Sequence, residues 1–258
     1  MAYHSIDPKA NRAIYHQIAD QLRRRLDEGI LGPGKKLPSE RQLMEEFHTA
    51  RGTIRQAIAV LKSEGLIESE HGRGVFVRQK PPIRRKANTR FLRQHRMAGQ
   101  AAFIVEAESE GRIPEVEILR LEPDIPPAAI AEALRLDPRS KALIRSRRYL
   151  ADGFPVELAT SYVPWKLARG TAIARANSGP GGIYARLEER GHRLDHFVEE
   201  VTARMPTPEE ADQLQLGSGV PVIVLIRTAF DHEGTPVEVC DTTMASDRFV
   251  LSYRFPAE

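Results

Sequence analysis

The sequence has almost no cysteine and no long apolar run. Cys240 is the single cysteine among 258 residues, which excludes an internal disulfide framework and a cysteine-rich zinc site and fits a reducing cytoplasm. A run of about 18 apolar residues, which a transmembrane helix needs, is absent. The first ten residues also lack the apolar core of a secretory signal. We therefore expect a cytoplasmic protein that has no membrane partner.

The composition is that of a globular chain whose charge is unevenly distributed. Hydrophobic residues make up 41% and charged residues 28%, and the length allows one large domain or two modest ones. Residues 1–78 have a net charge of +3, residues 79–96 have seven basic and no acidic side chains, and residues 97–258 have a net charge of −7. A basic front part joined to an acidic remainder indicates that the front part contacts a polyanion.

Three helices and a two-stranded ribbon are predicted before residue 79. Apolar side chains recur at helical spacing at Ile14, Ile18, Leu22 and Leu26, and again at Ile54, Ala57, Ile58 and Leu61. Between these stretches, Ser39 and Gln42 form a capping box that opens a short helix. Leu66–Glu70 and Val75–Arg78 have the character of two short strands around a tight turn. This order is typical of a winged helix-turn-helix, which we assign to residues 1–78.

Residues 79–96 are predicted to be a basic linker, because Pro81 and Pro82 disfavour both helix and sheet. Residues 97–258 combine strand patterns with short helices. Strands are expected at Val116–Leu121, Leu143–Leu150, Val156–Val163, Val220–Phe230 and Val237–Met244, and helices at Ile183–Arg190 and Pro208–Leu214. The whole chain is therefore expected to be α+β, with a mixed, mainly antiparallel sheet in the second domain.

The second domain repeats a sequence pattern. Leu134-x-Leu136, ten residues, Arg147 and Gly153-x-Pro155-Val156-Glu157 correspond to Leu214-x-Leu216, ten residues, Arg227 and Gly234-x-Pro236-Val237-Glu238. We interpret this as a helix–strand–hairpin unit used twice; the alternative is chance agreement of common hairpin residues. Two such units would form a cleft between them, which is a natural site for a small molecule.

Arginine side chains stand at the start of the predicted third helix. Arg51 and Arg55 are one turn apart on the face opposite the apolar positions. The N-terminal end of a recognition helix meets base edges first, and arginine pairs bidentately with guanine. The alternative is an ordinary solvated helix face. Further DNA contacts are expected from Lys36, Arg41, His71 and Arg73.

These motifs resemble a known family almost from end to end. Leu37-Pro38-Ser39-Glu40-Arg41, Arg51-x-Thr53-Ile54-Arg55-Gln56-Ala57 and Gly72-Arg73-Gly74-Val75-Phe76-Val77 resemble the DNA-binding domain of the GntR family. Arg147, Ala151-Asp152-Gly153, Ile183-Tyr184 and Gly234-x-Pro236-Val237-Glu238 resemble the UTRA effector domain of the HutC subfamily, which is similar to chorismate lyase in fold. The excess of Arg (30) over Lys (8) is typical of actinobacterial members.

The resemblance implies a homodimeric transcription factor, usually a repressor, that releases a pseudo-palindromic DNA operator when a metabolite binds. It also implies DNA contacts by Thr53 and Gly72. Two positions depart from the family pattern: Ala50 stands where Ser or Thr is usual, and Gly52 where Thr is usual. Because a Ser or Thr cap stabilises a helix start, we expect DNA binding with a somewhat altered operator.

The effector half departs from relatives that sense sugar phosphates. Those relatives carry two arginines separated by one residue, where this chain has Arg147 and Tyr149, and Ala159 replaces a sugar-contacting glutamate. We therefore expect a weakly acidic or polar metabolite and no cofactor or metal. The residues expected to hold it are Arg147, Tyr149, Gly181, Gly182 and Glu238, whereas Arg145 and Arg148 are expected to be surface charges.

Two alternatives are open at this point. The likeness to a lyase fold suggests an enzyme, but no nucleophile–base pair stands out in the sequence, and His192 and His196 follow Gly191, where the predicted helix ends. A constitutive DNA-binding repressor whose second domain only dimerises is the other alternative, and release of DNA by a small molecule would distinguish it.

Overall fold

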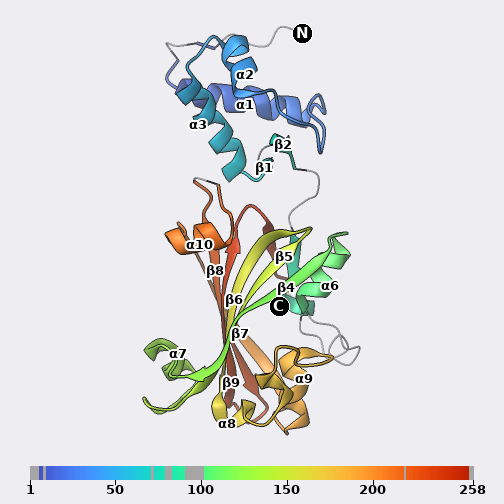
Figure 1. Cartoon of the computed structure of the whole chain (residues 1–258), viewed down its shortest axis with the longest axis vertical. Coiled ribbons are helices and arrows are strands. Elements are labelled where there is room, and N and C mark those ends of the chain that lie inside the picture. Colours follow the sequence, from blue (N-terminus) through green and yellow to red (C-terminus); the bar gives the residue numbers. More distant parts are fainter. Residues whose placement is uncertain are drawn as a thin grey trace. The chain divides into compact units, whose positions relative to one another are not determined.

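The structure is a computed structural model that describes residues 6–7, 10–70, 73–78, 83–90, 102–217 and 219–255. The chain divides into two compact units. One comprises Met1–Pro82 with Leu216–Pro221, and the other comprises Ile83–Gln215 with Val222–Glu258 (Figure 1). Each helix in the described ranges is too short or too polar to cross a membrane.

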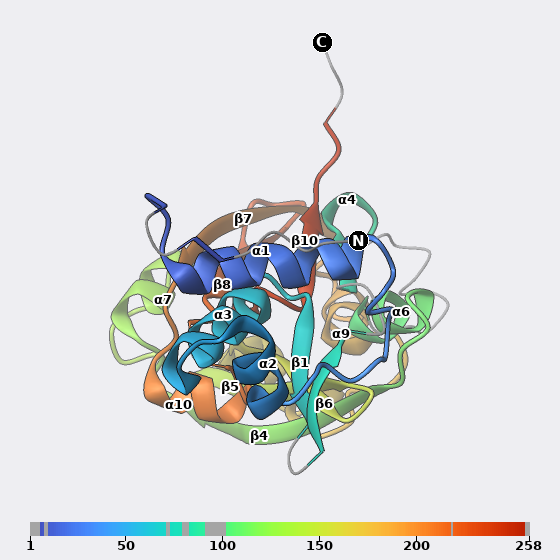
Figure 2. The same ribbon diagram turned by 90° about the horizontal axis from the view of Figure 1, so that it is seen from above.

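The first unit has the predicted three helices and two-stranded ribbon. Its elements are α1 (Ile14–Asp27), α2 (Glu40–Phe47), α3 (Arg51–Ser63), β1 (Ile67–Glu70) and β2 (Gly74–Val77), with the two strands antiparallel. Figure 2 shows α1 lying across α3. The apolar stripes meet in one core in which Ile18, Leu22 and Ile54 are fully buried. The predicted capping box is present, because Ser39 and Gln42 exchange backbone and side-chain hydrogen bonds at the start of α2.

The second unit is built around a six-stranded antiparallel sheet in the order β4-β5-β6-β9-β8-β7. The strands are β4 (Pro114–Asp124), β5 (Ala142–Ala151), β6 (Phe154–Pro164), β7 (Leu194–Arg204), β8 (Val222–Asp231) and β9 (Pro236–Ala245). The short helices are α6 (Ala102–Ser109), α7 (Ala128–Ala133), α8 (Trp165–Ala168), η1 (Ala172–Ala174), α9 (Gly182–Glu189) and α10 (Pro208–Gln213). The mainly antiparallel α+β arrangement is thus confirmed.

The predicted repeat is visible in the topology of this sheet. The series α6-β4-α7-β5-β6 recurs as α9-β7-α10-β8-β9, and the last strands of the two series, β6 and β9, pair at the centre. Corresponding positions also keep the same backbone conformation: Arg135 and Gln215, just after α7 and α10, have φ of 51° and 49°. The sheet therefore consists of two similar halves, and β7, which the sequence pattern did not predict, takes the place of β4 in the second half.

Part of the segment predicted as a linker is folded. Within residues 79–96, Ile83–Lys86 form β3, which pairs in parallel with β10 (Phe249–Ser252), and Ala87–Arg90 form α4. Alternate residues of β3 point inward, so Ile83 and Arg85 are buried. The linker prediction is wrong for this stretch, because Arg85 finds buried carboxylates that are distant in sequence. Residues 79–82 and 91–96 lie outside the described residues.

Candidate DNA-reading and effector sites

Arg51 and Arg55 lie on the exposed face of α3. Their side chains are each 71% exposed, because the opposite face of α3 packs into the core through Ile54, Ala57 and Leu61. Arg51 Nε donates a hydrogen bond to Glu40 Oε2 at 2.6 Å. Arg55 Nε lies 3.9 Å from Glu40 Oε1. Both guanidinium groups are thus available to an external partner at one end of the helix.

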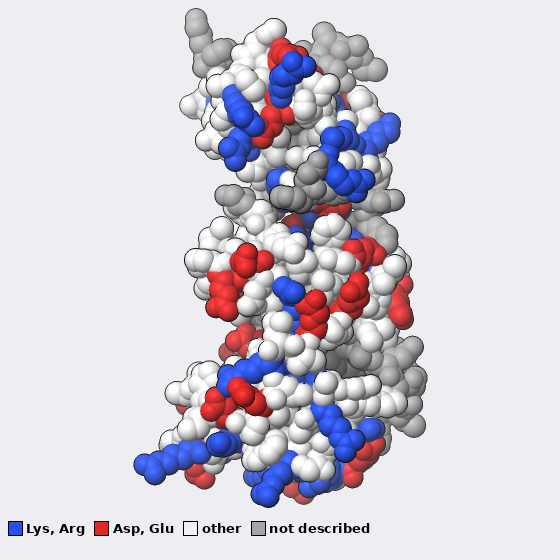
Figure 3. Space-filling view, viewed as in Figure 1, with Lys and Arg blue, Asp and Glu red and all other residues white. Residues whose placement is uncertain are grey.

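The other predicted DNA contacts also lie in the first unit. Arg41 is exposed on α2, and Thr53 is half-buried in the first turn of α3. Lys36 and Arg73 approach the Phe76 ring, with cationic groups 5.8 and 5.5 Å from the ring centre. His71 and Gly72 lie outside the described residues. In the view of Figure 3, several Lys and Arg side chains lie on the surface of this unit, with fewer acidic side chains among them.

The start of α3 reflects the departures from the family pattern. Its N-cap residue, Ala50, has extended backbone angles but makes no side-chain capping bond. Gly52 lies in the first turn, where its missing side chain leaves open space. The helix therefore begins without a capping hydroxyl at residue 50 or a hydroxyl at residue 52, and Thr53 is the residue of its first turn that carries one.

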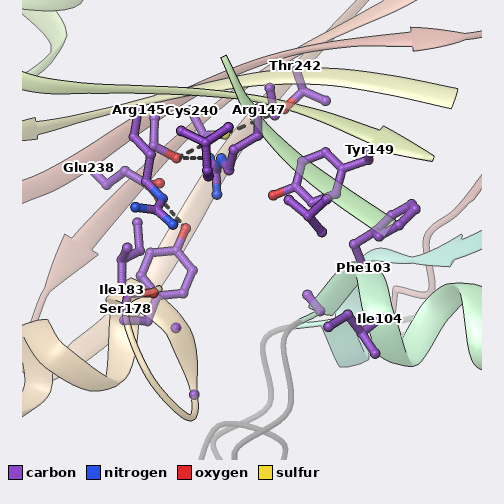
Figure 4. A pocket seen from close by; sticks show the side chains of 18 of the residues that line it. Phe103, Ile104, Arg145, Arg147, Tyr149, Ser178, Ile183, Glu238, Cys240 and Thr242 are labelled. Carbon is purple, nitrogen blue, oxygen red and sulfur yellow. Dashed lines mark hydrogen bonds between the residues drawn. The ribbon is translucent and has the colours of Figure 1, made fainter. Parts of the chain in front are cut away.

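A cavity of about 550 Å³ lies against one face of the sheet in the second unit. Arg145, Arg147 and Tyr149 project into it from β5, because alternate side chains of a strand point to the same face. Figure 4 shows Arg145 above the loop before α9, whereas Tyr149 lies on the side of Phe103 and Ile104 of α6. The ring centres of Tyr149 and Phe103 are 4.7 Å apart. The cavity is lined by all five residues predicted to hold an effector: Arg147, Tyr149, Gly181, Gly182 and Glu238.

Arg147 and Tyr149 form one wall of this cavity. The Arg147 guanidinium donates to the Ser161 hydroxyl and lies 5.6 Å from the centre of the Tyr149 ring. Burial raises the pKa of the Tyr149 hydroxyl, so this group stays protonated at neutral pH and can donate a hydrogen bond. The pair therefore offers a cation next to a neutral donor.

Glu238 is held by a buried pair of side chains on the opposite side. Tyr184 on α9 donates its hydroxyl proton to Glu238 and accepts a hydrogen bond from Arg227 Nε at 3.2 Å. Burial raises the pKa of Tyr184 well above its usual value, so Tyr184 remains a donor. Sequence reasoning did not assign Tyr184 or Arg227 to the site. The sequence repeat could have indicated Arg227, because it places this residue in correspondence with Arg147.

A second buried group of charges borders the cavity at Glu157, the repeat counterpart of Glu238. Glu157 accepts a bond from Arg85, whose Nε lies 3.5 Å from Glu106. Arg90 also pairs with Glu106, at 2.6 Å. Arg90 and Glu157 both line the cavity. The sequence did not predict these contacts, because the stretch that contains Arg85 and Arg90 was expected to be a linker.

Arg145 is a buried structural residue, which corrects the prediction of a surface charge. Its side chain is 6% exposed in the folded chain, and it donates to the carbonyls of Arg175 and Ala176, each at 2.6 Å. These bonds fix the loop that leads to Gly181 and Gly182, whose φ of 76° and 68° favour glycine. Arg148, in contrast, pairs with Glu117 on the surface as predicted.

The charge on the cavity wall favours an anion. The described lining residues include the four arginines Arg90, Arg145, Arg147 and Arg227, but two carboxylates, Glu157 and Glu238. When the ion-pair partners Arg85, Glu106 and Glu199 are included, five arginines of the described residues face four carboxylates. In low-dielectric surroundings this small excess of positive charge attracts a ligand with a small negative charge. In the described part of the chain, no three His, Cys, Asp or Glu side chains lie together as metal ligands would. His192 instead pairs with Asp231, and His196 with Asp195.

Comparison with known proteins gives matches over both units. The sequence matches the UTRA domain over residues 109–250 and the family described as bacterial regulatory proteins, gntR family, over residues 14–77. It is 33% identical to the uncharacterized HTH-type transcriptional regulator SCO4628 of Streptomyces coelicolor, over 96% of this chain and 94% of that protein. It is 28% identical to the HTH-type transcriptional repressor NagR of Bacillus subtilis, over 96% of both chains.

A similar fold is found among solved structures. The crystal structure of PhnF from Mycobacterium smegmatis matches with a TM-score of 0.60 at 24% sequence identity, over 93% of this chain and 100% of that chain. At this identity the match supports the fold. The sequence relatives are transcriptional regulators, and none of those named here is described as an enzyme.

Proposed function

We infer that this chain, which belongs to the GntR family of bacterial regulatory proteins and is a DNA-binding transcription regulator, acts as a metabolite-controlled repressor. It would bind a pseudo-palindromic operator as a cytoplasmic homodimer and release it when a small metabolite occupies the second unit. A repressor is supported by the likeness to NagR, which is named as one. Control by a metabolite is supported by the positively charged cavity that Arg147 lines.

The DNA-reading role is proposed for the N-terminal end of α3. Arg51 and Arg55 would contact base edges in the major groove, because both are exposed and project from one end of an anchored helix. Thr53, Arg41 and Lys36 would contact the backbone, and His71, Gly72 and Arg73 would place the wing in the minor groove. A phosphate contact changes affinity for every sequence, whereas a base contact changes selectivity.

The effector is proposed to be a weakly acidic or polar organic metabolite. The cavity volume of about 550 Å³ lies within the range of small-molecule sites. Arg147 would pair with an acidic group of the ligand, and the amide of Gly181, the N-cap residue of α9, would add a donor. Gly182 would line the site, because its own amide already donates to the Gly179 carbonyl. Tyr149 and Glu238 would bind uncharged polar groups of the ligand. Arg90, Arg145 and Arg227 already bind Glu106, backbone carbonyls and Tyr184, so Arg147 beside Tyr149 is the arginine assigned to the ligand. One such arginine suits a smaller charge than a phosphosugar carries.

The homodimer is supported by the two open edges of the six-stranded sheet. The edge strands β4 and β7 carry the exposed apolar side chains Leu119, Val198 and Val201, whereas the exposed Val116 and Ile118 of β4 line the cavity. An unpaired sheet edge can pair with another chain, and an exposed apolar patch marks an interaction surface. A twofold dimer would also match the half-sites of a palindromic operator. The constitutive repressor is the second candidate, but it leaves the charged cavity without a role.

A thermal-shift screen tests the ligand-controlled repressor. Wild type and Arg147→Ala are screened with small carboxylic acids, sugar phosphates and inorganic phosphate, because a ligand that binds the native state raises its melting temperature. We expect at least one carboxylic acid to stabilise wild type, to have little effect on Arg147→Ala, and to lower DNA affinity. Arg148→Ala, which loses a surface arginine of the same strand, is the control. No stabilising compound, or equal stabilisation of Arg147→Ala, would contradict the proposal.

A further inference from the structure

One carboxylate, that of Glu40, serves both arginines of the proposed reading helix. Glu40 is the first residue of α2, directly after the capping box at Ser39, and its side chain is 33% exposed. Its Oε2 accepts the bond from Arg51 Nε at 2.6 Å, and its Oε1 lies 3.9 Å from Arg55 Nε. Each carboxylate oxygen thus faces a different arginine, and both arginines are contacted at Nε.

Contact at Nε leaves the terminal Nη1 and Nη2 groups of the guanidinium available for contact with a base. A bidentate contact with guanine uses two of the five N–H donors of arginine, in a planar fork. Within the described residues, Arg51 donates no hydrogen bond other than the one from Nε. Glu40 can therefore restrict the rotamer of Arg51 without occupying its terminal Nη1 and Nη2 groups.

We propose that Glu40 is a specificity-determining positioning residue that orders Arg51 for base contact through its hydrogen bond, places a negative charge near Arg55, and weakens binding to DNA of unrelated sequence. The inference rests on the proposed role of these two arginines as base-reading residues. Ordering a long side chain before binding reduces the entropy lost in the complex. A carboxylate beside the arginines also repels phosphates, and attraction to phosphates dominates binding to non-specific DNA. Both effects raise the ratio of specific to non-specific affinity.

Glu45 provides a matched control on the same helix. It lies one turn from Arg41, with an Oε1–Nε distance of 3.7 Å, and both side chains are highly exposed, at 65% and 84%. Pairs of that kind contribute little order. Replacing Glu45 by alanine removes the same charge from α2 but leaves the contacts of Arg51 and Arg55 in place.

The experiment measures affinity for two duplexes with the full-length chain at one fixed salt concentration. One duplex is selected by wild type from a random-sequence pool, and the other is its scrambled version. For Glu40→Ala we expect affinity for the scrambled duplex to rise about twofold to fivefold, and the specificity ratio to fall at least about tenfold. Glu40→Gln keeps an acceptor oxygen for Arg51, so we expect it to recover part of the ratio. For Glu45→Ala we expect a ratio within about twofold of wild type.

Arg51→Ala separates failure of this inference from failure of the proposed function. If Arg51→Ala keeps the wild-type ratio, the base-reading role of α3 is wrong. If Arg51→Ala loses the ratio but Glu40→Ala keeps it, Glu40 has no positioning role. An equal loss in Glu45→Ala would show a general charge effect and would also overturn the inference. Melting temperatures are recorded for each variant, and Glu40→Gln decides the question if Glu40→Ala does not fold.

Discussion

Single buried polar side chains hold the wall of the candidate effector cavity. Glu238 is 1% exposed, and its carboxylate depends on Tyr184, which also accepts a bond from Arg227. When a buried acceptor loses its donor, the free-energy cost of removing the acceptor from water, about 1–3 kcal/mol, is no longer offset by a hydrogen bond. The wall of the cavity is therefore sensitive to the loss of one hydroxyl group.

Tyr184→Phe tests this dependence. We expect it to lower the free energy of unfolding of the second unit by about 1–3 kcal/mol, because Glu238 and Arg227 both lose a partner. Tyr253→Phe is the control: Tyr253 also donates to a glutamate, Glu199, at 3.0 Å, but it is exposed. It should cost less than about 0.5 kcal/mol. Urea denaturation measures both, and equal effects would contradict the account.

Glu210 predicts a pH dependence of stability. Hydrogen bonds from Arg204 lower the pKa of the Glu210 carboxyl to about 2 in the folded chain. Because the pKa of Glu210 is lower in the folded chain, the unfolded chain binds the proton at a higher pH than the folded chain does. The contribution to stability is then complete above the ordinary value of 4.5 and is lost as the pH falls toward 2.

We expect Glu210→Gln to lose part of this acid sensitivity. Allowing for solvent screening at Arg204, the contribution is on the order of 1–2 kcal/mol. The free energy of unfolding, measured by chemical denaturation, should fall less between pH 6 and pH 3 for Glu210→Gln than for wild type. The Glu209 carboxylate accepts a hydrogen bond from Gln213. For Glu209→Gln, the free energy of unfolding should fall with pH as much as it does for wild type. An unchanged drop in Glu210→Gln would show that the pair with Arg204 contributes nothing.

Among the elements, β3 is a short strand that links buried charges to the candidate effector cavity. Arg85 is 2% exposed and pairs with Glu157 and Glu106, whereas its neighbour Arg84 points to solvent. Removing one partner from a buried ion pair typically costs about 3–5 kcal/mol, because the other charge is left uncompensated. The alternation along β3 therefore offers a buried arginine and an exposed one, whose replacement is expected to have a large and a small effect on stability.

Arg85→Ala should lower the free energy of unfolding of the second unit by about 3–5 kcal/mol, and Arg84→Ala by less than about 0.5 kcal/mol. Hydrogen exchange at Phe249–Ser252 gives a second measurement, because these residues pair with β3. Their amides should exchange faster in Arg85→Ala than in Arg84→Ala. Similar stability of the two variants would contradict the buried network.

The start of α3 offers a change that should stabilise the first unit. Ala50 has φ of −72° and ψ of 151°, which suit a capping residue, but it supplies no side-chain acceptor. Ala50→Ser should raise the free energy of unfolding of this unit by about 0.5–2 kcal/mol. Gln56→Ser, on the exposed face of the same helix, should instead lower it slightly. Thermal unfolding measures both, and a neutral or destabilising Ala50→Ser would contradict the capping argument.

Across the whole molecule, sequence patterns predicted the elements that carry a strong periodicity. The helices around Leu22 and Ile58 and the hairpin after Arg147 were recognised because apolar positions recur at 3.6 or 2 residues. The strand β7 was missed because it is an edge strand with mostly exposed side chains, so its alternation is weak. The strand β3 was missed because prolines and positive charges precede and surround it.

The candidate site was predictable in part for the same physical reason. Arg147 and Glu238 were found through the repeat and the resemblance, which depend on local patterns. Arg85, Arg90 and Arg145 were not, because their partners are carboxylates or carbonyls that the fold brings from distant positions. A buried arginine and an exposed one look the same in sequence until those partners are known.

The base-reading role of α3 is the central claim about the molecule, and DNA binding by paired variants tests it most directly. Titration of a selected palindromic duplex compares wild type with Arg51→Ala/Arg55→Ala. Arg139→Ala/Arg190→Ala, two exposed arginines of the second unit, is the charge-matched control. We predict that two wild-type chains bind one duplex, that the first variant loses at least about 100-fold in affinity, and that the control stays within about threefold. Wild-type affinity in Arg51→Ala/Arg55→Ala would contradict the account.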